Sequence, residues 1–373
     1  MRVVKMYFDD ASKVFTTRNF VSFTPMALLL QLDVKGSYHF LEKLRSMYQE
    51  VPLKNSSYIP DFLGDGFERM TLELPADYEG KVSATLIRKS AQKASQKAVL
   101  YVHGFNDYFF QKEMAEKFNE EGYNFYALDL RKYGRSYLGH QKFNNVRSII
   151  EYDEELDLAL QLIKSENNHQ VILMGHSNGG LITTNYAVNH LNSKLFHGLI
   201  SNSPFYEFNL SYITRTIGVP ILSFWGQYFP NLRIPGVPSG SYGDSLHVQR
   251  HGEWDYSLAW KPHEVPKLNL GFIRAIHKAQ KNIRQKAIIG VPTLILHSNQ
   301  SINEKHWSEN FERGDAVLNV THIKKYAHKL SGAVTICEIE NGIHDLILSK
   351  KPVREEVYRI LFDWINTNFN KTH

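Results

Sequence analysis

From about residue 68 onward, short apolar runs alternate with stretches of helical periodicity. The segments ERMTLEL and VSATLIRK alternate apolar and polar positions, which is typical of two strands of a hairpin. KAVLYVHGF and YNFYALDL are short continuous apolar runs and predict buried strands. Between them, QKEMAEKFNEEG has the spacing of a helix that ends at Gly122.

The alternation continues to the end of the sequence. It predicts strands in VILM, in LFHGLISNSP, in VPTLILHS and in AVTICEIENG, the last two of them buried, and a helix directly after VILM. Two amphipathic helices are also predicted. The apolar face of the first carries Tyr152, Leu156, Leu160 and Ile163, and that of the second, the last helix, carries Val353, Val357, Ile360, Leu361 and Trp364. Strands that alternate with helices favour the α/β class, with a mostly parallel sheet and helices on both faces. Such sheets carry their functional loops at the carboxyl ends of the strands.

Two segments interrupt this pattern. Residues 206–288 are rich in proline, glycine and aromatic residues, and contain a predicted helix over 268–284. Because a structureless loop of that length is improbable in a compact domain, we interpret 206–288 as a cap inserted between two parts of the core, 61–205 and 289–373. Residues 1–60 form a separate N-terminal extension with a predicted helix near YHFLEKLRSMYQE.

The composition is that of an ordinary soluble protein, with 43% hydrophobic and 22% charged residues. The net charge of +5 is spread along the chain, and the basic clusters RKYGR and IHKAQKNIRQK are interrupted by other residues. We interpret these clusters as solvated helix faces and expect no nucleic-acid partner.

The cysteine content and the N-terminal residues indicate the cellular compartment of the protein. Cys337 is the one cysteine, which excludes a disulfide framework and predicts a small core residue. The N-terminus MRVVKMYFDDASK has no secretory pattern, and FTPMALLLQL is too short to span a bilayer. We therefore expect a cytoplasmic protein.

The pentapeptide GHSNG, residues 175–179, lies between a predicted strand and a predicted helix. This is the context of a G-x-S-x-G nucleophile elbow, in which a strained turn holds the serine hydroxyl out at the sheet edge. The glycines are expected because side chains at these positions would collide with neighbouring strands. The alternative is a glycine-rich turn with a solvated Ser177.

A second loop supplies groups that could assist Ser177. The strand in YVHGFNDY ends at His103, Gly104 and Phe105, where an oxyanion hole of this type finds its second donor. We expect the backbone N–H groups of Phe105 and Asn178 to stabilise a developing oxyanion. His103 is expected to shape the loop rather than to transfer protons.

A serine nucleophile needs a base, and the base in turn needs an acid. His344 lies directly after the last predicted strand, in ENGIHD, and histidine titrates near neutrality, so we assign it as the base. For the acid we prefer Asp315, in the loop ERGDAVLNV, over Glu304. Asp345 is disfavoured because adjacent side chains on an extended loop diverge.

Other polar residues bear on metal or amine binding. HVQRH places His247 and His251 four residues apart but lacks the glutamate of a zinc peptidase, so we expect surface histidines and no metal. Asp244, Glu253 and Asp255 are candidates for binding a substrate amine if the enzyme is an aminopeptidase or amidase.

The motifs HGFNDY, DLRKYGRS, GHSNGG, SNSPF, GDAVLNV and NGIHD resemble the α/β-hydrolase superfamily, specifically its lysophospholipase and monoacylglycerol-lipase-like branch, also called serine aminopeptidase-like. The resemblance covers about residues 68 to 368. It implies a cap, no cofactor, and hydrolysis of carboxylic esters with a lipid-like acyl chain. The sequence departs from the family pattern at the catalytic acid. Asp315 lies further downstream of the strand VPTLILHS than the aspartate of the family usually does.

The cap sequence ILSFWGQYF bears on the substrate. It could line an acyl tunnel, contact a membrane transiently, or pack as a buried face on the sheet. We therefore expect a small-molecule, lipid-like ester as the substrate, with an aminopeptidase or amidase as the alternative. A non-catalytic interaction module is the least favoured hypothesis.

Overall fold

A computed structural model describes residues 57–236, 240–285, 287–304 and 306–369. The helix expected near YHFLEKLRSMYQE and the apolar run FTPMALLLQL lie outside the described residues. Among the helices of the described part, none is both long and apolar enough to cross a membrane.

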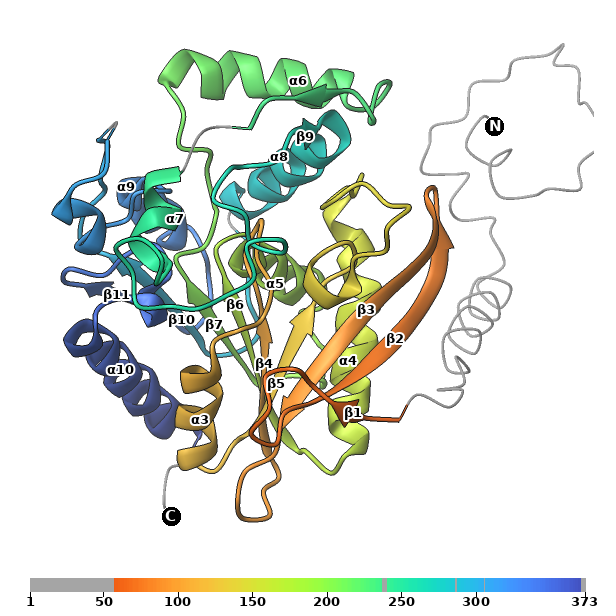
Figure 1. Ribbon diagram of the computed structural model, residues 1–373, viewed down its shortest axis with the longest axis vertical. Helices are drawn as coiled ribbons and strands as arrows, with labels where there is room; N and C mark the ends of the chain where they lie inside the picture. Colours follow the sequence, from red (N-terminus) through yellow and green to blue (C-terminus); the bar gives the residue numbers. More distant parts are fainter. Residues whose placement is uncertain (1–56, 237–239, 286, 305, 370–373) are drawn as a thin grey trace, which may run out of the picture. The chain divides into compact units, whose positions relative to one another are not determined.

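The main sheet is nine-stranded and mostly parallel (Figure 1), as the alternation of strands and helices predicted. Its strands follow the order β1-β2-β3-β5-β4-β6-β7-β10-β11. The pairs among β1, β2, β3 and β5 are antiparallel, and the pairs from β5 through β4 to β11 are parallel. The strands are β1 (Ile59–Pro60), β2 (Glu68–Asp77), β3 (Gly80–Lys89), β4 (Lys97–Val102), β5 (Asn124–Asp129), β6 (Gln170–His176), β7 (Gly198–Asn202), β10 (Thr293–Ser298) and β11 (Val334–Ile339).

Helices cover both faces of this sheet (Figure 1). Successive strand residues point to opposite faces, so Leu100 of β4 packs in one core and Tyr101 in the other. The first core includes side chains of α4 (Asp153–Ser165), α5 (Asn178–Asn189), α8 (Leu270–Arg284) and α9 (Val320–Ala327); the second includes α3 (Lys112–Glu120) and α10 (Lys351–Phe369).

The segment between β7 and β10 adds further helices at the carboxyl ends of the strands. It contains α6 (Val219–Trp225), α7 (Gly240–Leu246), α8, and a two-stranded sheet of β8 (Arg233–Ile234) and β9 (Leu268–Asn269). Here α8 packs on α5, and α6 packs on α8 (Figure 1). The helix predicted over 268–284 is confirmed as α8.

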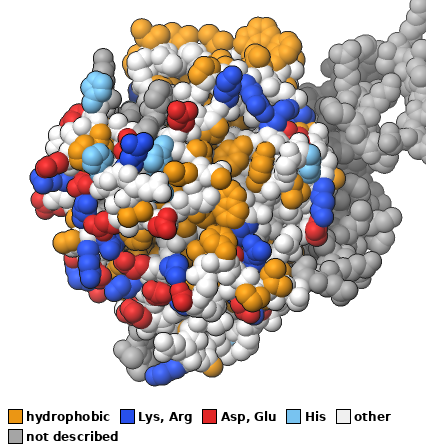
Figure 2. Space-filling view, viewed as in Figure 1, with side chains coloured by type: hydrophobic (Ala, Val, Ile, Leu, Met, Phe, Trp, Pro, Cys, Tyr) orange, Lys and Arg blue, Asp and Glu red, His pale blue; other side chains and the backbone are white. Residues whose placement is uncertain are grey.

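One face of α6 and its flanking residues is exposed. Ile221 and Phe224 are 51% and 55% exposed, and Figure 2 shows apolar side chains gathered over α6. We call this surface the α6 apolar face; its members are Tyr212, Ile213, Ile217, Ile221, Phe224, Trp225, Tyr228, Phe229 and Leu232. The interpretation of ILSFWGQYF as a face buried against the sheet is therefore wrong, because α8 lies between α6 and the sheet.

Two other expectations about burial are also wrong. AVTICEIENG was expected to form a buried strand, but β11 is the last strand of the sheet and all of its residues except Ile339 are partly buried or exposed. Cys337 on this strand is likewise partly buried rather than a core residue. An apolar run does not reveal whether a strand lies at the edge of a sheet or in its centre.

The basic cluster RKYGR is not a solvated helix face. Arg131 and Lys132, in the loop after β5, are buried, and the side chain of Arg135 is only 1% exposed. Each one meets carboxylates: Arg131 contacts Glu154 and Glu155, Lys132 contacts Asp77 (2.6 Å) and Glu79 (2.9 Å), and Arg135 contacts Asp61 and Asp129 (both 2.8 Å). These ion pairs anchor the loop to the antiparallel strands and to α4.

Lys132 yields a prediction about stability. Its side chain is fully buried between Asp77 and Glu79, so Lys132→Met removes the nearest cation from two carboxylates whose side chains are each 9% exposed. We expect the free energy of unfolding at pH 7 to fall by about 3–5 kcal/mol, measured by urea denaturation. Lys142→Met is the matched control, because Lys142 meets the same Glu79 at 3.6 Å but is 35% exposed; its loss should stay below about 1 kcal/mol.

The effect of Lys132→Met should depend on pH. Burial raises the pKa of Glu79, but hydrogen bonds from Lys132 and Asn145 outweigh it and hold the pKa below its usual value. A carboxylate of lowered pKa stabilises the fold above its unfolded pKa and loses that contribution as pH falls through the folded pKa. The difference between wild type and variant should therefore shrink in acid, and a difference that grows in acid would contradict this account.

Candidate active site

Ser177 lies at the sharp turn between β6 and α5. Its backbone has φ 53° and ψ −113°, a conformation that non-glycine residues rarely adopt. A Cβ on Gly179 would come within 2.3 Å of the Val102 carbonyl oxygen at the end of the neighbouring β4. A Cβ on Gly175 would come within 2.4 Å of the Gly179 carbonyl oxygen. A neighbouring strand therefore excludes a side chain at Gly179, whereas the first turn of α5 excludes one at Gly175.

The structure brings Ser177, His344 and Asp315 together in one hydrogen-bonded chain. His344 Nε2 lies 2.9 Å from Ser177 Oγ, and His344 Nδ1 lies 2.9 Å from Asp315 Oδ2. With the Nδ1 proton donated to Asp315, Nε2 can accept the Ser177 hydroxyl proton. All three side chains are buried, which strengthens these interactions.

Asp315 reaches the site through a loop that returns to the end of β10. Its backbone N–H donates to the Gln300 carbonyl oxygen at 2.9 Å, and its carbonyl oxygen accepts from Ile302 N–H at 2.8 Å. The Asp315 carboxylate also accepts the N–H groups of Val317 and Leu318, at 2.8 and 2.7 Å. This pairing places an acid that is distant in sequence beside the strand end.

The other carboxylates considered for this position lie elsewhere. Glu304 is exposed and accepts hydrogen bonds from Ser308 and Asn310. Asp345 accepts from Asn202 Nδ2 at 2.7 Å, so its side chain does diverge from that of its neighbour His344.

The loop after β4 passes directly beside Ser177. A Cβ on Gly104 would lie 3.2 Å from the Ser177 Cβ, closer than an ordinary contact, so a side chain here would push the loop and Ser177 apart. The N–H groups of Phe105 and Asn178 donate no hydrogen bond to any residue that the structure describes. His103 contacts the Gly104 carbonyl oxygen at 2.7 Å and accepts from Leu130 N–H at 3.1 Å, and burial lowers its pKa, so it braces this loop as a neutral ring.

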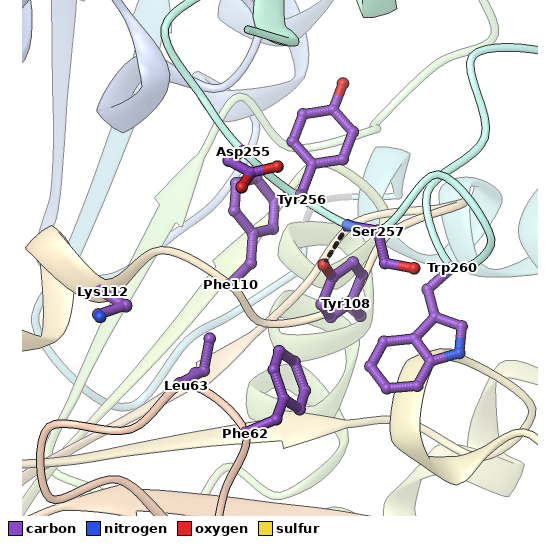
Figure 3. A pocket seen from close by; sticks show the side chains of 9 residues that line it. All are labelled: Phe62, Leu63, Tyr108, Phe110, Lys112, Asp255, Tyr256, Ser257 and Trp260. Carbon is purple, nitrogen blue, oxygen red and sulfur yellow. Dashed lines mark hydrogen bonds between the residues drawn. The ribbon is translucent and has the colours of Figure 1, made fainter. Parts of the chain in front are cut away.

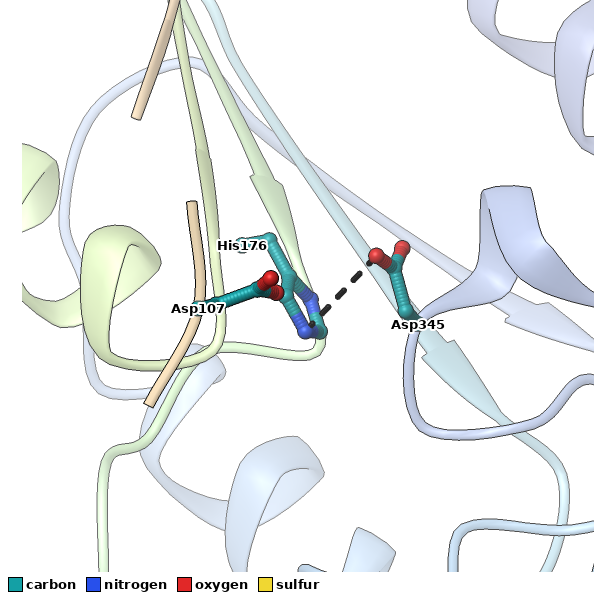
Figure 4. Close-up of side chains that lie close together, drawn as sticks. All are labelled: Asp107, His176 and Asp345. Carbon is teal, nitrogen blue, oxygen red and sulfur yellow. Dashed lines mark ion pairs between the residues drawn. The ribbon is translucent and has the colours of Figure 1, made fainter. Parts of the chain in front are cut away.

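A buried cluster behind His344 was not predicted from the sequence. Asp107, His176 and Asp345 point toward one another (Figure 4), and their potential ligand atoms lie within 4.8 Å of one another. Burial lowers the pKa of His176 well below its usual value and raises the pKa of Asp345. These residue types could hold a metal ion, but Lys261 Nζ already lies 2.7 Å from Asp107, so a divalent cation would have to displace it.

The paired histidines of HVQRH do not face a common point. His247 is buried, with Nε2 3.2 Å from the Tyr256 carbonyl oxygen, so its assignment to the surface is wrong. His251 is exposed and stacks on the Trp307 ring, with a centroid distance of 3.5 Å.

The candidate amine-binding carboxylates also have other contacts. Asp244 pairs with Arg250 and His263, and Glu253 pairs with Arg354 and Lys350. Asp255 lines a surface groove of about 510 Å³ (Figure 3). The groove is lined by Phe62, Leu63, Tyr108, Phe110, Lys112, Asp255, Tyr256, Ser257 and Trp260, and it includes none of Ser177, His344 and Asp315.

Several solved hydrolases share the fold. A soluble variant of monoglyceride lipase from Saccharomyces cerevisiae has a TM-score of 0.59 and 16% identity, over 85% of this chain and 97% of that one. Monoacylglycerol lipase from Paleococcus ferrophilus has a TM-score of 0.56 and 19% identity, over 76% and 99%. Est1E from Butyrivibrio proteoclasticus, bound to ferulic acid, has a TM-score of 0.51 and 15% identity, over 80% and 100%.

The family assignment rests on the sequence itself. A search of curated proteins found no match. Residues 93–347, more than half of the chain, match the family described as serine aminopeptidase, S33. This range begins just before β4 and runs past His344, so it includes every residue of the hydrogen-bonded chain. The protein therefore belongs to the serine aminopeptidase, S33 family and is an α/β-hydrolase, which confirms the resemblance predicted from its motifs.

Proposed function

We propose that this protein is a serine hydrolase that cleaves carboxylic esters through an acyl-enzyme on Ser177. The observation that carries the proposal is the continuous hydrogen-bonded chain from Ser177 through His344 to Asp315. The base and its acid come from separate loops that converge on a strained serine, an arrangement that a merely structural serine does not require.

In the first half of the reaction, His344 Nε2 accepts the Ser177 hydroxyl proton while Oγ attacks the ester carbonyl carbon. Asp315 holds the imidazole in the required tautomer and stabilises the imidazolium that forms. The carbonyl oxygen becomes an oxyanion, which the Phe105 and Asn178 N–H groups stabilise. The imidazolium then gives its proton to the departing alcohol.

In the second half, water replaces the alcohol. His344 removes a proton from the water, which attacks the acyl carbon, and the collapsing intermediate returns the proton to Ser177 Oγ. Residues 206–288 act as a cap in this proposal. Tyr242 of α7 packs against His344, with ring centroids 5.6 Å apart, and Phe272 of α8 packs against Phe105 at 5.2 Å, so the cap shields the reacting atoms from water.

We further propose that the ester is lipid-like and is taken from an anionic membrane surface. The α6 apolar face is large and exposed, as expected for a surface that meets a partner or a membrane. Residues 208–243 and 265–303 contain no aspartate or glutamate, whereas Arg233 and the α8 residues Arg274, Lys278 and Lys281 provide positive charge. Two of the solved relatives by fold are named as monoglyceride or monoacylglycerol lipases, which is consistent with this substrate class.

The nucleophile can be tested by substitution. Ser177→Ala should lower kcat for p-nitrophenyl butyrate by at least about 10⁴-fold and abolish labelling by a fluorophosphonate probe, because no other group takes the acyl chain. Ser211→Ala, at an exposed serine, is the control and should behave as wild type. Retention of turnover by Ser177→Ala would rule out the proposed mechanism.

The acid can be tested by comparing two carboxylates. Asp315→Asn should present an amide to His344 Nδ1 and favour the wrong tautomer, so kcat should fall by roughly 10³–10⁴-fold. Glu304→Gln should stay within about twofold of wild type, since the hydrogen bonds of Glu304 within the described part of the chain come from Ser308 and Asn310. The reverse ranking of the two variants would assign the acid to Glu304.

The lipid surface can be tested with Ile221→Ser/Phe224→Ser, which changes two exposed side chains of the α6 apolar face. Hydrolysis of monooleoylglycerol in phosphatidylglycerol vesicles should fall by at least about tenfold, because less apolar surface enters the membrane, while hydrolysis of soluble p-nitrophenyl acetate stays unchanged.

The matched control is Ile59→Ser/Ile150→Ser, at two similarly exposed positions outside that face, which should leave both activities unchanged. Equal losses in the two double variants would argue against docking through α6. Faster cleavage of aminoacyl-naphthylamides than of monoacylglycerols by the wild type would instead favour an aminopeptidase.

A further inference from the structure

The loop that carries Phe105 is held from outside by residues 257–272. Phe105 packs on Phe272, and Asn106 Nδ2 donates to the Pro262 carbonyl oxygen at 2.8 Å. Two residues further on, Tyr108 OH accepts from Ser257 N–H at 2.7 Å, as Figure 3 shows. Three residues of this short loop are therefore fastened to the segment between β7 and β10.

The strongest of these contacts is ionic. Lys261 Nζ lies 2.7 Å from Asp107 Oδ2, and the two side chains are only 12% and 2% exposed. Figure 4 shows His176 between Asp107 and the second buried carboxylate, Asp345. The Lys261 ammonium thus compensates negative charge that the protein has removed from water, and a buried pair of this kind is weakened little by salt.

The loop needs such a restraint because its own conformation is unfavourable. Asn106 has φ 57°, in the left-handed region, which is unfavourable for a residue other than glycine. Asn106 lies between Phe105 and Asp107, so release of Asp107 would let the backbone relax at the residue next to Phe105. A rotation there would change the direction of the adjoining backbone, including the Phe105 N–H.

We propose that Lys261 is a positioning residue: its ion pair with Asp107 fixes the loop after β4 so that the Phe105 N–H faces the oxyanion formed at Ser177. This inference rests on the proposed serine mechanism. It gives the cap a direct part in catalysis, because the residue that secures the oxyanion donor belongs to the cap and not to the core.

The test compares Lys261→Met, Asp107→Asn and the double variant in the full chain. Fluorophosphonate titration first counts the active sites, so that kcat refers to folded enzyme only. Lys261→Met should lower kcat for p-nitrophenyl butyrate by about 10- to 100-fold with KM within about threefold, as expected for a misplaced oxyanion donor. The Ki of a trifluoromethyl ketone with the same acyl chain should rise by a similar factor, because that inhibitor forms the oxyanion.

Two further comparisons complete the design. The double variant should be no slower than the slower single variant, since the two residues act as one unit. Lys89→Met is the matched control: Lys89 pairs with Glu116 at 3.1 Å and is 18% exposed, but it joins β3 to α3, so kcat per titrated site should be unchanged.

Three results would overturn the proposal: a kcat per titrated site for Lys261→Met within twofold of wild type, losses that multiply in the double variant, or a Ki that does not follow kcat. The serine mechanism is judged separately. An inactive Ser177→Ala enzyme together with a fully active Lys261→Met enzyme would reject the role of Lys261 alone.

Discussion

The backbone of Ser177 imposes the constraint on which the site depends. The chain turns sharply at Ser177, where φ is 53°, between β6 and α5, and the hydroxyl lies at the carboxyl edge of the sheet. The loops after β4, β10 and β11 begin at the same edge. Such a turn is possible only where neighbouring backbone can approach closely, which explains the glycines at 175 and 179. His344 can reach Ser177 because the two strands that precede them run parallel and end at the same edge.

The segment between β7 and β10 completes this edge. Its side chains contact the site at three points: Tyr242 against His344, Lys261 on Asp107, and Phe272 against Phe105. The same segment turns the α6 apolar face outward. One segment therefore carries both the proposed membrane contact and side chains that contact the loops of the site.

Local patterns predicted much of this arrangement. The steric requirements of the turn at Ser177 involve the five residues 175–179, and His344 directly follows the last strand. Both positions could therefore be predicted from the local sequence. Asp315 was harder to place, because its position depends on backbone pairing with residues 300–302, far from it in sequence. The buried Lys132 and the largely buried Lys261 were missed for a physical reason: a lysine leaves water only when carboxylates from distant segments surround it, and no local pattern encodes that.

The most direct test of the central claim is a crystal structure of the enzyme after reaction with a fluorophosphonate. The account predicts phosphorus bonded to Ser177 Oγ, with one phosphonyl oxygen within hydrogen-bond distance of the Phe105 and Asn178 N–H groups. A phosphonyl oxygen directed away from both N–H groups, or an adduct on any residue other than Ser177, would contradict it.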